Sequence, residues 1–200
     1  MNILITGGAG FIGSHLAEEL LRDEKNRVYI IDNLSTGRLE NIEHLLETPR
    51  FHYTIDTILN EKAVDKLISK CEQVYHLAAA VGVKLIMERP LETIETNVRG
   101  AEIVLRAANK YKRKVLITST SEIYGSHVQH TLSEDDNRIL GPIKKWRWAY
   151  ASSKTLDEFM ALAYYIEKKL SVVTVRLFNT VGRRQTGAYG MVIHNFVQSA

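Results

Sequence analysis

The sequence predicts an α/β fold, a doubly wound parallel β-sheet with helices on both faces. Two observations predict it. Short apolar segments, several of them rich in Val, Ile or Tyr, alternate with longer amphipathic segments along the 200 residues. A glycine-rich turn joins the first apolar segment to the first amphipathic one. Such alternation is typical of βαβ units, in which buried parallel strands are short, continuous apolar runs.

Each element follows from a local pattern. Apolar runs predict six strands, at 2–6, 27–31, 51–55, 73–77, 114–118 and 171–176. Apolar residues at helical spacing predict helices at 12–23, 61–69, 91–111 and 149–168, with a less distinct one near 38–46. In the third of these helices the apolar stripe is Ile94, Val98, Ala101, Val104, Leu105 and Ala108, and in the fourth it is Leu156, Phe159, Met160, Ala163 and Tyr164.

Two further stretches stand outside this alternation. An irregular stretch at 125–148 separates the fifth strand from the last long helix, and a loop of that length in a compact domain usually covers a site. Apolar residues from Met191 onward predict another helix that is still in progress at Ala200. We therefore expect the natural chain to be longer.

Composition and charge are those of an ordinary globular protein, with 45% hydrophobic and 24% charged residues. The net charge of +3, from 26 basic and 23 acidic residues, gives no reason to expect a nucleic-acid or membrane partner. The single cysteine, Cys71, excludes an internal disulfide framework and a cysteine-rich zinc site, and no metal ion is expected. Because no apolar run has membrane length and the N-terminus lacks a basic signal-like region, we expect a cytoplasmic enzyme.

The most specific local pattern is the turn after the first strand. Gly7, Gly10 and Gly13 follow that strand in the spacing Gly-x-x-Gly-x-x-Gly, with Phe11 and Ile12 inside the turn, and a helix follows directly. Glycines here let the backbone turn tightly and approach a pyrophosphate. The helix directs its free N–H groups and positive dipole end at that charge. The pattern predicts a dinucleotide site on a Rossmann-type sheet.

A carboxylate at the expected distance along the chain from the glycine turn strengthens this prediction. Asp32 ends the second strand, 19 residues after Gly13, about where an acid meets the adenosine ribose of a dinucleotide. A carboxylate accepts hydrogen bonds from the 2′-hydroxyl and repels a 2′-phosphate. NAD is therefore expected rather than NADP.

A tyrosine and a lysine near the start of the last long helix, Tyr150 and Lys154, lie one turn apart on one helix face. A free tyrosine has a pKa of ~10, and a general base works best when its pKa is near the working pH. Lowering that pKa by roughly 3 units requires about 4 kcal/mol of preferential phenolate stabilisation. A nearby ammonium and the positive charge of oxidised NAD could supply it. The same spacing is common on helix surfaces, so the pair indicates a catalytic role only in combination with the dinucleotide-binding glycine turn.

Six motifs follow one another along the chain: Gly7-x-x-Gly10-x-x-Gly13, Asp32-Asn-Leu-Ser-Thr-Gly37, His76-Leu-Ala-Ala79, Ser119-Thr-Ser-Glu-Ile-Tyr-Gly125, Tyr150-x-x-x-Lys154 and Arg176-x-x-Asn179. Together they resemble the extended short-chain dehydrogenase/reductase family, in its nucleotide-sugar epimerase/dehydratase branch, and are most like the UDP-glucose 4-epimerases. The resemblance spans essentially all 200 residues. It implies an NAD-binding Rossmann domain over 1–178 and the beginning of a substrate-binding region over 179–200.

The resemblance also implies site residues. Tyr150 would take the proton from a sugar hydroxyl, Lys154 would hold the nicotinamide ribose and lower the pKa of Tyr150, and Thr120 would hydrogen-bond the reacting oxygen. Glu122 is a fourth catalytic candidate, with a solvated or helix-capping carboxylate as its alternative. Cofactor contacts are implied for Gly7, Gly10, Phe11, Ile12, Gly13, Asp32, Asn33, Ser35, Thr36, Gly37, Asp56, Thr57, Leu77, Ala78, Ala79, Asn97, Tyr150 and Lys154, and substrate contacts for Thr120, Ser121 and Asn179.

The expected reaction is NAD-dependent epimerisation of a nucleotide sugar, at C4 of a UDP-hexose or UDP-uronate and through a 4-keto intermediate. The alternatives are a UDP-glucuronate decarboxylase and a nucleotide-sugar 4,6-dehydratase. Dehydratases typically have Asp-Glu after the threonine, whereas this chain has Ser121-Glu122, a pair also found in decarboxylases. A catalytically silent NAD-binding scaffold is the alternative outside enzymes. Family resemblance further implies a homodimer formed through the helices at 91–111 and 149–168.

Overall fold

The computed structural model describes residues 1–126, 131–187 and 196–197. Its centre is a sheet of six parallel strands in the order β3-β2-β1-β4-β5-β6. The strands are β1 (Asn2–Thr6), β2 (Arg27–Asp32), β3 (Phe51–Ile55), β4 (Gln73–His76), β5 (Lys114–Thr120) and β6 (Val172–Leu177). All six predicted strands are confirmed, and the α/β class with them. The strand order reverses between β1 and β4, the place where a doubly wound sheet binds its ligand.

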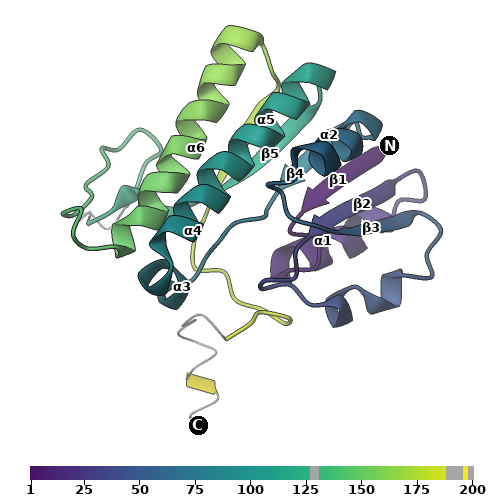
Figure 1. The fold of residues 1–200 in the computed structure, drawn as a ribbon, viewed down its shortest axis with the longest axis horizontal. Helices are drawn as coiled ribbons and strands as arrows, with labels where there is room; N and C mark the ends of the chain where they lie inside the picture. The colour runs from purple at the N-terminus through teal and green to yellow at the C-terminus, as the bar shows by residue number, and fades with distance from the viewer. Residues whose placement is uncertain (127–130, 188–195, 198–200) are drawn as a thin grey trace.

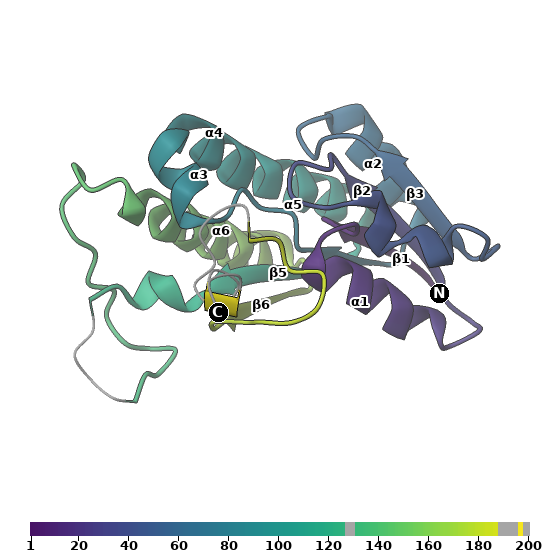
Figure 2. The same cartoon turned by 90° about the horizontal axis from the view of Figure 1, so that it is seen from below.

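Helices cover both faces of the sheet, and the two layers are unequal (Figures 1 and 2). One face carries α2, α5 and α6, whose apolar residues form a large core with Leu4, Val74 and Ile117 of the sheet. The other face carries α1, which packs with Ile5 and Ile30 in a smaller core. The bounds of these helices are α1 Phe11–Leu21, α2 Glu61–Lys70, α5 Gly100–Tyr111 and α6 Arg147–Lys168.

The helix predicted at 91–111 is interrupted. It consists of α4 (Pro90–Ile94), a π-helical turn η3 (Glu95–Arg99) and α5. Sequence periodicity missed α3 (Val83–Glu88), because six residues are too few to show a repeating apolar stripe. The helix predicted near 38–46 is instead a pair of 3₁₀ turns, η1 (Leu39–Asn41) and η2 (Glu43–Leu45).

The described part of the 125–148 loop is fixed at two points. Ile139 pairs with Gly125, whose φ of +71° brings the two backbones so close that a Cβ on Gly125 would lie 2.0 Å from the Ile139 carbonyl oxygen. Arg138 forms an ion pair with Glu158 of α6. The loop therefore lies at the N-terminal end of α6, at the left of Figure 1.

The chain after β6 crosses from the sheet to the glycine-turn side of the molecule (Figure 2). Arg184 forms an ion pair with Glu18 and donates a hydrogen bond to Ser14 Oγ, both on α1. The predicted final helix from Met191 lies almost wholly outside the described residues.

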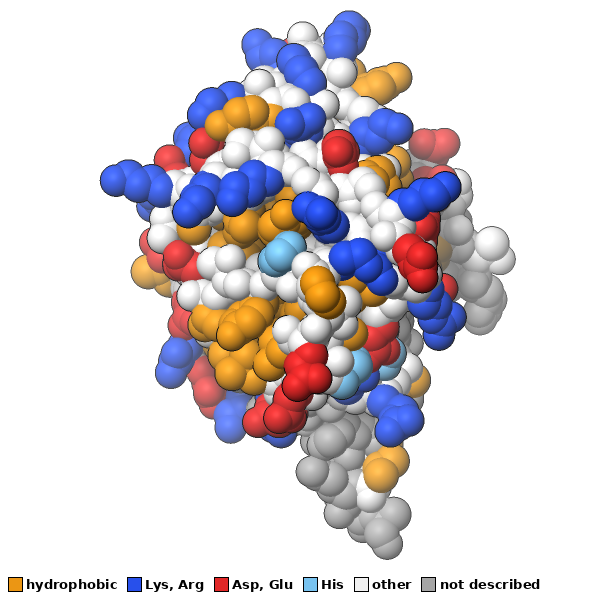
Figure 3. Space-filling model, turned by 90° about the vertical axis from the view of Figure 1, so that its right-hand side faces the viewer, with side chains coloured by type: hydrophobic (Ala, Val, Ile, Leu, Met, Phe, Trp, Pro, Cys, Tyr) orange, Lys and Arg blue, Asp and Glu red, His pale blue; other side chains and the backbone are white. Residues whose placement is uncertain are grey.

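The surface of the molecule carries both signs of charge. Figure 3 shows Lys and Arg side chains gathered on the upper part of one face, with Asp and Glu side chains and hydrophobic patches below and between them. At this end of the sheet β3 is the edge strand, and its Tyr53 and Ile55 are half-exposed. Within the described ranges, no helix is both long and apolar enough to cross a bilayer.

Candidate functional site

The glycine turn lies at the carboxyl end of β1, beside the loop after β4. Gly7 has φ of +72°, and a Cβ there would lie 2.9 Å from the Ala78 nitrogen. A Cβ on Gly13 would lie 2.1 Å from the Gly7 carbonyl oxygen, so α1 and the turn pack against each other through backbone atoms. A Cβ on Gly10 would meet only that same oxygen, at 3.2 Å, and otherwise open space. Two of the glycines thus close the turn, and the third leaves its outer surface bare.

The first turn of α1 is open to a ligand. Its N-cap is Gly10, which has no side chain to bond the first helical N–H groups. Such N–H groups have no partner within the helix, and the positive end of the helix dipole lies among them. Phe11 and Ile12, the first two helical residues, present their backbone N–H groups at this position.

Asp32 is buried against the same turn, with 7% of its surface exposed. Its Oδ2 accepts a hydrogen bond from the Ala9 N–H at 2.9 Å, and its Oδ1 accepts one from the Leu34 N–H at 2.8 Å. Burial raises the pKa of Asp32, while these backbone hydrogen bonds oppose the rise. A carboxylate has about four acceptor positions, so Asp32 can hold the turn and still accept from ribose hydroxyls.

The segment after Asp32 folds back over its carboxylate. Leu34 has φ of +58°, and the Asn33 side chain accepts a hydrogen bond from the Ser35 N–H. Gly37 lies so close that a Cβ there would be 2.9 Å from both Asp32 oxygens. The backbone segment that carries Asn33, Ser35 and Thr36 therefore lies beside the carboxylate, and the contacts of these three residues with a cofactor stay a prediction.

Asp56 and Thr57 lie at the carboxyl end of β3. The Asp56 carboxylate accepts hydrogen bonds from the Thr57 N–H and from the side chain of Asn60, which caps α2. Thr57 Oγ1 in turn accepts from the Leu59 N–H. Both side chains thus organise the start of α2, and their contact with the cofactor stays a prediction.

Asn97 is the clearest positioning residue of the site. It is buried in the π turn η3, where its Oδ1 accepts from the Ala80 N–H at 2.8 Å and its Nδ2 donates to the Ala80 carbonyl and to Ser153 Oγ. The loop Leu77–Ala78–Ala79 is thereby fixed between β4 and α6. A π turn is a common way to place one side chain at a functional site.

Tyr150 is buried near the start of α6, with 7% of its surface exposed. Burial raises the pKa of its phenol, and the charges of Glu122 and Asp157 raise it further. We expected Lys154 to lower this pKa. In the structure the Lys154 ammonium instead lies 2.9 Å from Asp157 Oδ2.

Thr120 and Ser121 connect β5 to the 3₁₀ turn η4 (Ser121–Tyr124). Thr120 is buried, and its Oγ1 accepts the Glu122 N–H at 3.2 Å. Glu122 extends to the surface, yet surrounding protein atoms raise the pKa of its carboxyl, against the opposing charge of Arg147. Its charge reaches Tyr150, so Glu122 of η4 lies near the phenol of α6. Asn179 is exposed just beyond the end of β6.

The sequence patterns missed a clamp next to this site. Arg176 of β6 donates to both Glu158 oxygens, at 2.9 and 2.8 Å, and to Tyr124 Oη at 2.9 Å. Burial alone would raise the pKa of Glu158, but the bonds from Arg176 outweigh it and lower that pKa. The spacing of Arg176 from Asn179 marked the arginine but gave no indication of its partners.

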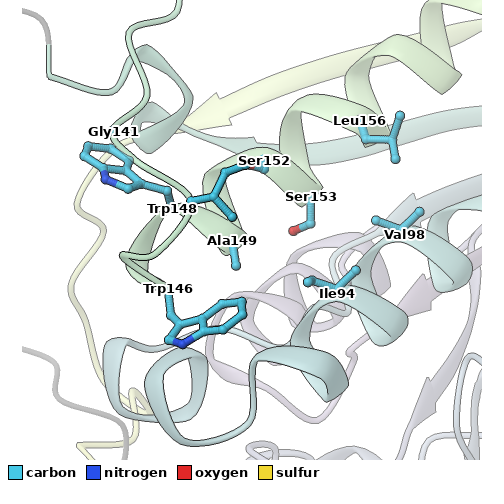
Figure 4. A pocket seen from close by; sticks show the side chains of 10 residues that line it. Ile94, Val98, Gly141, Trp146, Trp148, Ala149, Ser152, Ser153 and Leu156 are labelled. Carbon is cyan, nitrogen blue, oxygen red and sulfur yellow. The ribbon is translucent and has the colours of Figure 1, made fainter.

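The cavity nearest to α6 is not the tyrosine site. It has a volume of about 290 Å³ and lies on the outer side of α6, where Trp146 and Ala149 face Ile94 and Val98 (Figure 4). Trp148 lies against Gly141 of the long loop, so that a Cβ on that glycine would be 2.2 Å from the indole nitrogen. These tryptophans pack the loop and line an apolar groove.

The site as a whole fits NAD. Gly10 leaves a bare backbone surface at a helix N-terminus for a pyrophosphate, and Asp32 is held where it can accept from a ribose. Tyr150 and Lys154 are buried near the start of α6. Fold and site together define a dinucleotide-dependent domain of the tyrosine–lysine type.

A family model described as GDP-mannose 4,6 dehydratase matches residues 4–200, and the chain belongs to this family, within the extended short-chain dehydrogenase/reductases. It is 44% identical to the UDP-N-acetyl-alpha-D-glucosaminuronate decarboxylase of Bacillus cytotoxicus over 98% of this chain and 60% of that protein. It is 35% identical to UDP-glucuronic acid decarboxylase 6 of Arabidopsis thaliana over all of this chain and 57% of that protein. The chain thus spans less than two thirds of their length.

Among solved structures, the UDP-glucuronic acid 4-epimerase of Bacillus cereus in complex with UDP-glucuronic acid and NAD is similar, with a TM-score of 0.84 and 31% identity. The match covers 94% of this chain and 60% of that one. The predicted family and fold are confirmed by these matches, and so is NAD as the coenzyme of this type of site.

Proposed function

We propose that the protein containing this chain is an NAD-dependent decarboxylase of a UDP-sugar acid. The sequence alone placed C4 epimerisation first and decarboxylation second, and the 44% identical relative reverses that order. The Ser121-Glu122 pair after Thr120 supports the proposal, because the acid that a dehydratase needs is absent from it.

The residues of the site suit the first step, oxidation of the sugar at C4. Tyr150 accepts the proton of the C4 hydroxyl, and Thr120 hydrogen-bonds the same oxygen. Lys154 holds the nicotinamide ribose. NAD, when bound, would supply the hydride acceptor for C4 and the hydride returned at the end. The positive charge of its ring would oppose the groups of the protein that raise the pKa of Tyr150.

The second step follows from the chemistry of the oxidised sugar. A ketone at C4 makes the C6 carboxylate part of a β-keto acid. Breaking the C5–C6 bond releases carbon dioxide and leaves the electron pair on the enolate of the C4 ketone. A proton must then reach C5. We assign its delivery to Glu122, because a carboxyl with a raised pKa keeps its proton closer to neutral pH.

Substrate contacts complete the proposal. We place Ser121 beside the sugar and Asn179 at the diphosphate, on the first residues of a substrate-binding region at 179–200. Asn179 is exposed at the carboxyl edge of the sheet, where a ligand of this fold binds.

The test uses the full-length protein. It is incubated with NAD and, separately, with UDP-glucuronate, UDP-N-acetylglucosaminuronate and UDP-glucose, and the products are followed by mass and NMR. Loss of one carbon dioxide from either uronate is expected. A C4 epimer of unchanged mass would favour the second candidate, an epimerase, which the similarity to the Bacillus cereus enzyme supports. Retained NAD without turnover would contradict both and favour a silent scaffold.

We also propose a homodimer formed through the outer face of α4 and α6. The α6 residues Leu156, Phe159 and Leu162 form an exposed apolar stripe at helical spacing, and Leu91 of α4 is 67% exposed. The apolar cavity of Figure 4 continues this stripe. A two-fold axis would pair the stripe with its own copy. Sedimentation of the full-length protein should show a dimer that Leu162→Glu dissociates, whereas Leu46→Glu, on a half-exposed leucine of another surface, should leave it intact.

A further inference from the structure

Lys154 and Asp157 form an ion pair inside the protein. Lys154 Nζ lies 2.9 Å from Asp157 Oδ2, and the two residues are 1% and 0% exposed. The ammonium carries three N–H donors, so this bond leaves two for other partners. Asp157 Oδ1 is buried and has no hydrogen-bond partner among the described residues. The carboxylate therefore has Lys154 as its hydrogen-bonded cation.

Among the residues that the structure describes, the neighbours of this pair supply no other compensating charge. His76 of β4 is fully buried, and burial, assisted by the charge of Lys154, lowers its pKa to about 3, so it is neutral. On α6 itself, Glu158 turns to Arg176 of β6. Burial raises the pKa of Asp157, and Lys154 opposes the rise.

Two further ionisable groups belong to the same site. Tyr150 lies one turn before Lys154 on α6, and Glu122 of η4 acts on the same phenol. Asn97 of the packed π turn is uncharged and is occupied by Ala80 and Ser153. The net charge beside Tyr150 thus depends on whether Asp157 balances Lys154.

We propose that Asp157 is a positioning residue for the dinucleotide reaction, which holds Lys154 and balances its charge beside the nicotinamide end of the site. The inference rests on the proposed function only in assigning Lys154 to the ribose. A fully buried ion pair contributes little net stability to a fold, because the cost of desolvating two charges offsets their attraction. Lys154 follows Tyr150 by four residues and Asp157 follows it by seven, so both lie on the same side of α6 as the phenol. A role in the site therefore explains the pair better than a role in stability.

Charge balance at the site can be read without turnover. Oxidised NAD carries a positive charge on the nicotinamide ring, and NADH does not. If Asp157 balances Lys154, its neutralisation leaves an ammonium that disfavours the oxidised form more than the reduced one. The ratio of the Kd for NAD to the Kd for NADH should rise about five- to tenfold in Asp157→Asn, the size of effect that one charge produces in a partly buried site.

The experiment measures both dissociation constants in the full-length protein, by NADH fluorescence and by displacement with NAD. The acid limb of the pH profile of kcat/KM is a second readout. It should move about one unit lower in Asp157→Asn, because removing a negative charge lowers the pKa of Tyr150. Asp157→Glu, which keeps the charge, should return both values toward the parent. Glu167→Gln removes an exposed charge from the same helix and should change neither.

The results separate the two proposals. A raised ratio in a protein that fails to turn over any uronate supports the role of Asp157 and contradicts the proposed function. If Asp157→Asn raises the Kd values for NAD and NADH by the same factor and leaves the acid limb of the kcat/KM profile unchanged, Asp157 has only a structural role. If Asp157→Asn does not fold, Asp157→Glu decides, since a parent-like ratio supports charge balance and a raised ratio overturns it.

Discussion

The two ends of the candidate site, the glycine turn and the start of α6, are built from different kinds of atoms. At the glycine turn, the contacts are made by backbone atoms. Gly7 and Gly13 pack against other backbone atoms, and the Asp32 carboxylate accepts hydrogen bonds from backbone N–H groups. At the start of α6, the site is made of buried side chains, the phenol of Tyr150 and the ion pair of Lys154 and Asp157. A backbone site tolerates little change in shape, whereas a charged site tolerates little change in protonation.

A hydrogen-bonded bridge through Thr6 and His76 connects the two ends. Thr6, the last residue of β1, hydrogen-bonds His76 Nδ1 at 2.8 Å and accepts the Ala78 N–H at 3.1 Å. His76 lies near enough to Lys154 for the ammonium to lower its pKa. The strand that begins the glycine turn is thereby connected to the charged end through side chains of β1 and β4.

The largest expected effect separates chemistry from binding. Tyr150→Phe removes the proposed base while leaving the ring packed in α6. Turnover should fall roughly 10²- to 10⁴-fold, the usual contribution of a positioned general base, with NAD affinity near that of the parent. Steady-state kinetics and nucleotide titration of the full-length protein measure the two quantities.

Tyr165→Phe is the matched control, because Tyr165 is an exposed tyrosine on the same helix. It should leave both quantities unchanged. Undiminished turnover in Tyr150→Phe would remove the phenol from the mechanism, and the two ends of the site would then differ in structure but not in chemical role.

The difference between the two ends also decides what the sequence could predict. The strands and the glycine turn depend on patterns within about 35 residues, such as Gly7 to Asp32, and both were predicted closely. The partners of the charged end come from strands and helices far apart in the chain. Nothing local in the sequence indicates that Arg176 binds Glu158 or that Asn97 fixes the Ala80 loop.

Asp157 was missed for a different reason. A lysine and an aspartate three residues apart share a helix face, so the spacing was visible in the sequence. Most such pairs lie on the surface and contribute little. Burial distinguishes this one, and burial of the middle of α6 depends on how the helix packs against β5 and β6.

The next prediction tests the charged end through protein stability. His76 has its pKa lowered to about 3 in the folded protein, against 6.5 when unperturbed. The unfolded chain therefore binds more protons below pH 6.5, and stability present above that pH is lost as the pH falls toward 3. From pH 6.5 to 4.5 this amounts to about 2 kcal/mol.

Urea unfolding at several pH values measures this slope, and His76→Asn should flatten it. His52→Gln, at an exposed histidine of β3, is the control and should keep the parent slope. Equal slopes of the unfolding free energy against pH in the parent and His76→Asn would mean that this histidine binds protons as readily in the folded protein as in the unfolded chain. Water would then reach the charged end more than the burial of His76 indicates.

The smallest effect lies within the glycine turn and divides it into two kinds of position. In Gly13→Ala the new Cβ would lie 2.1 Å from the Gly7 oxygen, so backbone must move and the free energy of unfolding should fall by about 2 kcal/mol. In Gly10→Ala the nearest atom is 3.2 Å away, and stability should change by less than about 1 kcal/mol. That methyl group would, however, stand on the surface assigned to the pyrophosphate, so NAD affinity should drop at least tenfold. Urea unfolding and NAD titration separate the two variants, because a turn that serves only the fold would make Gly10→Ala harmless in both measurements.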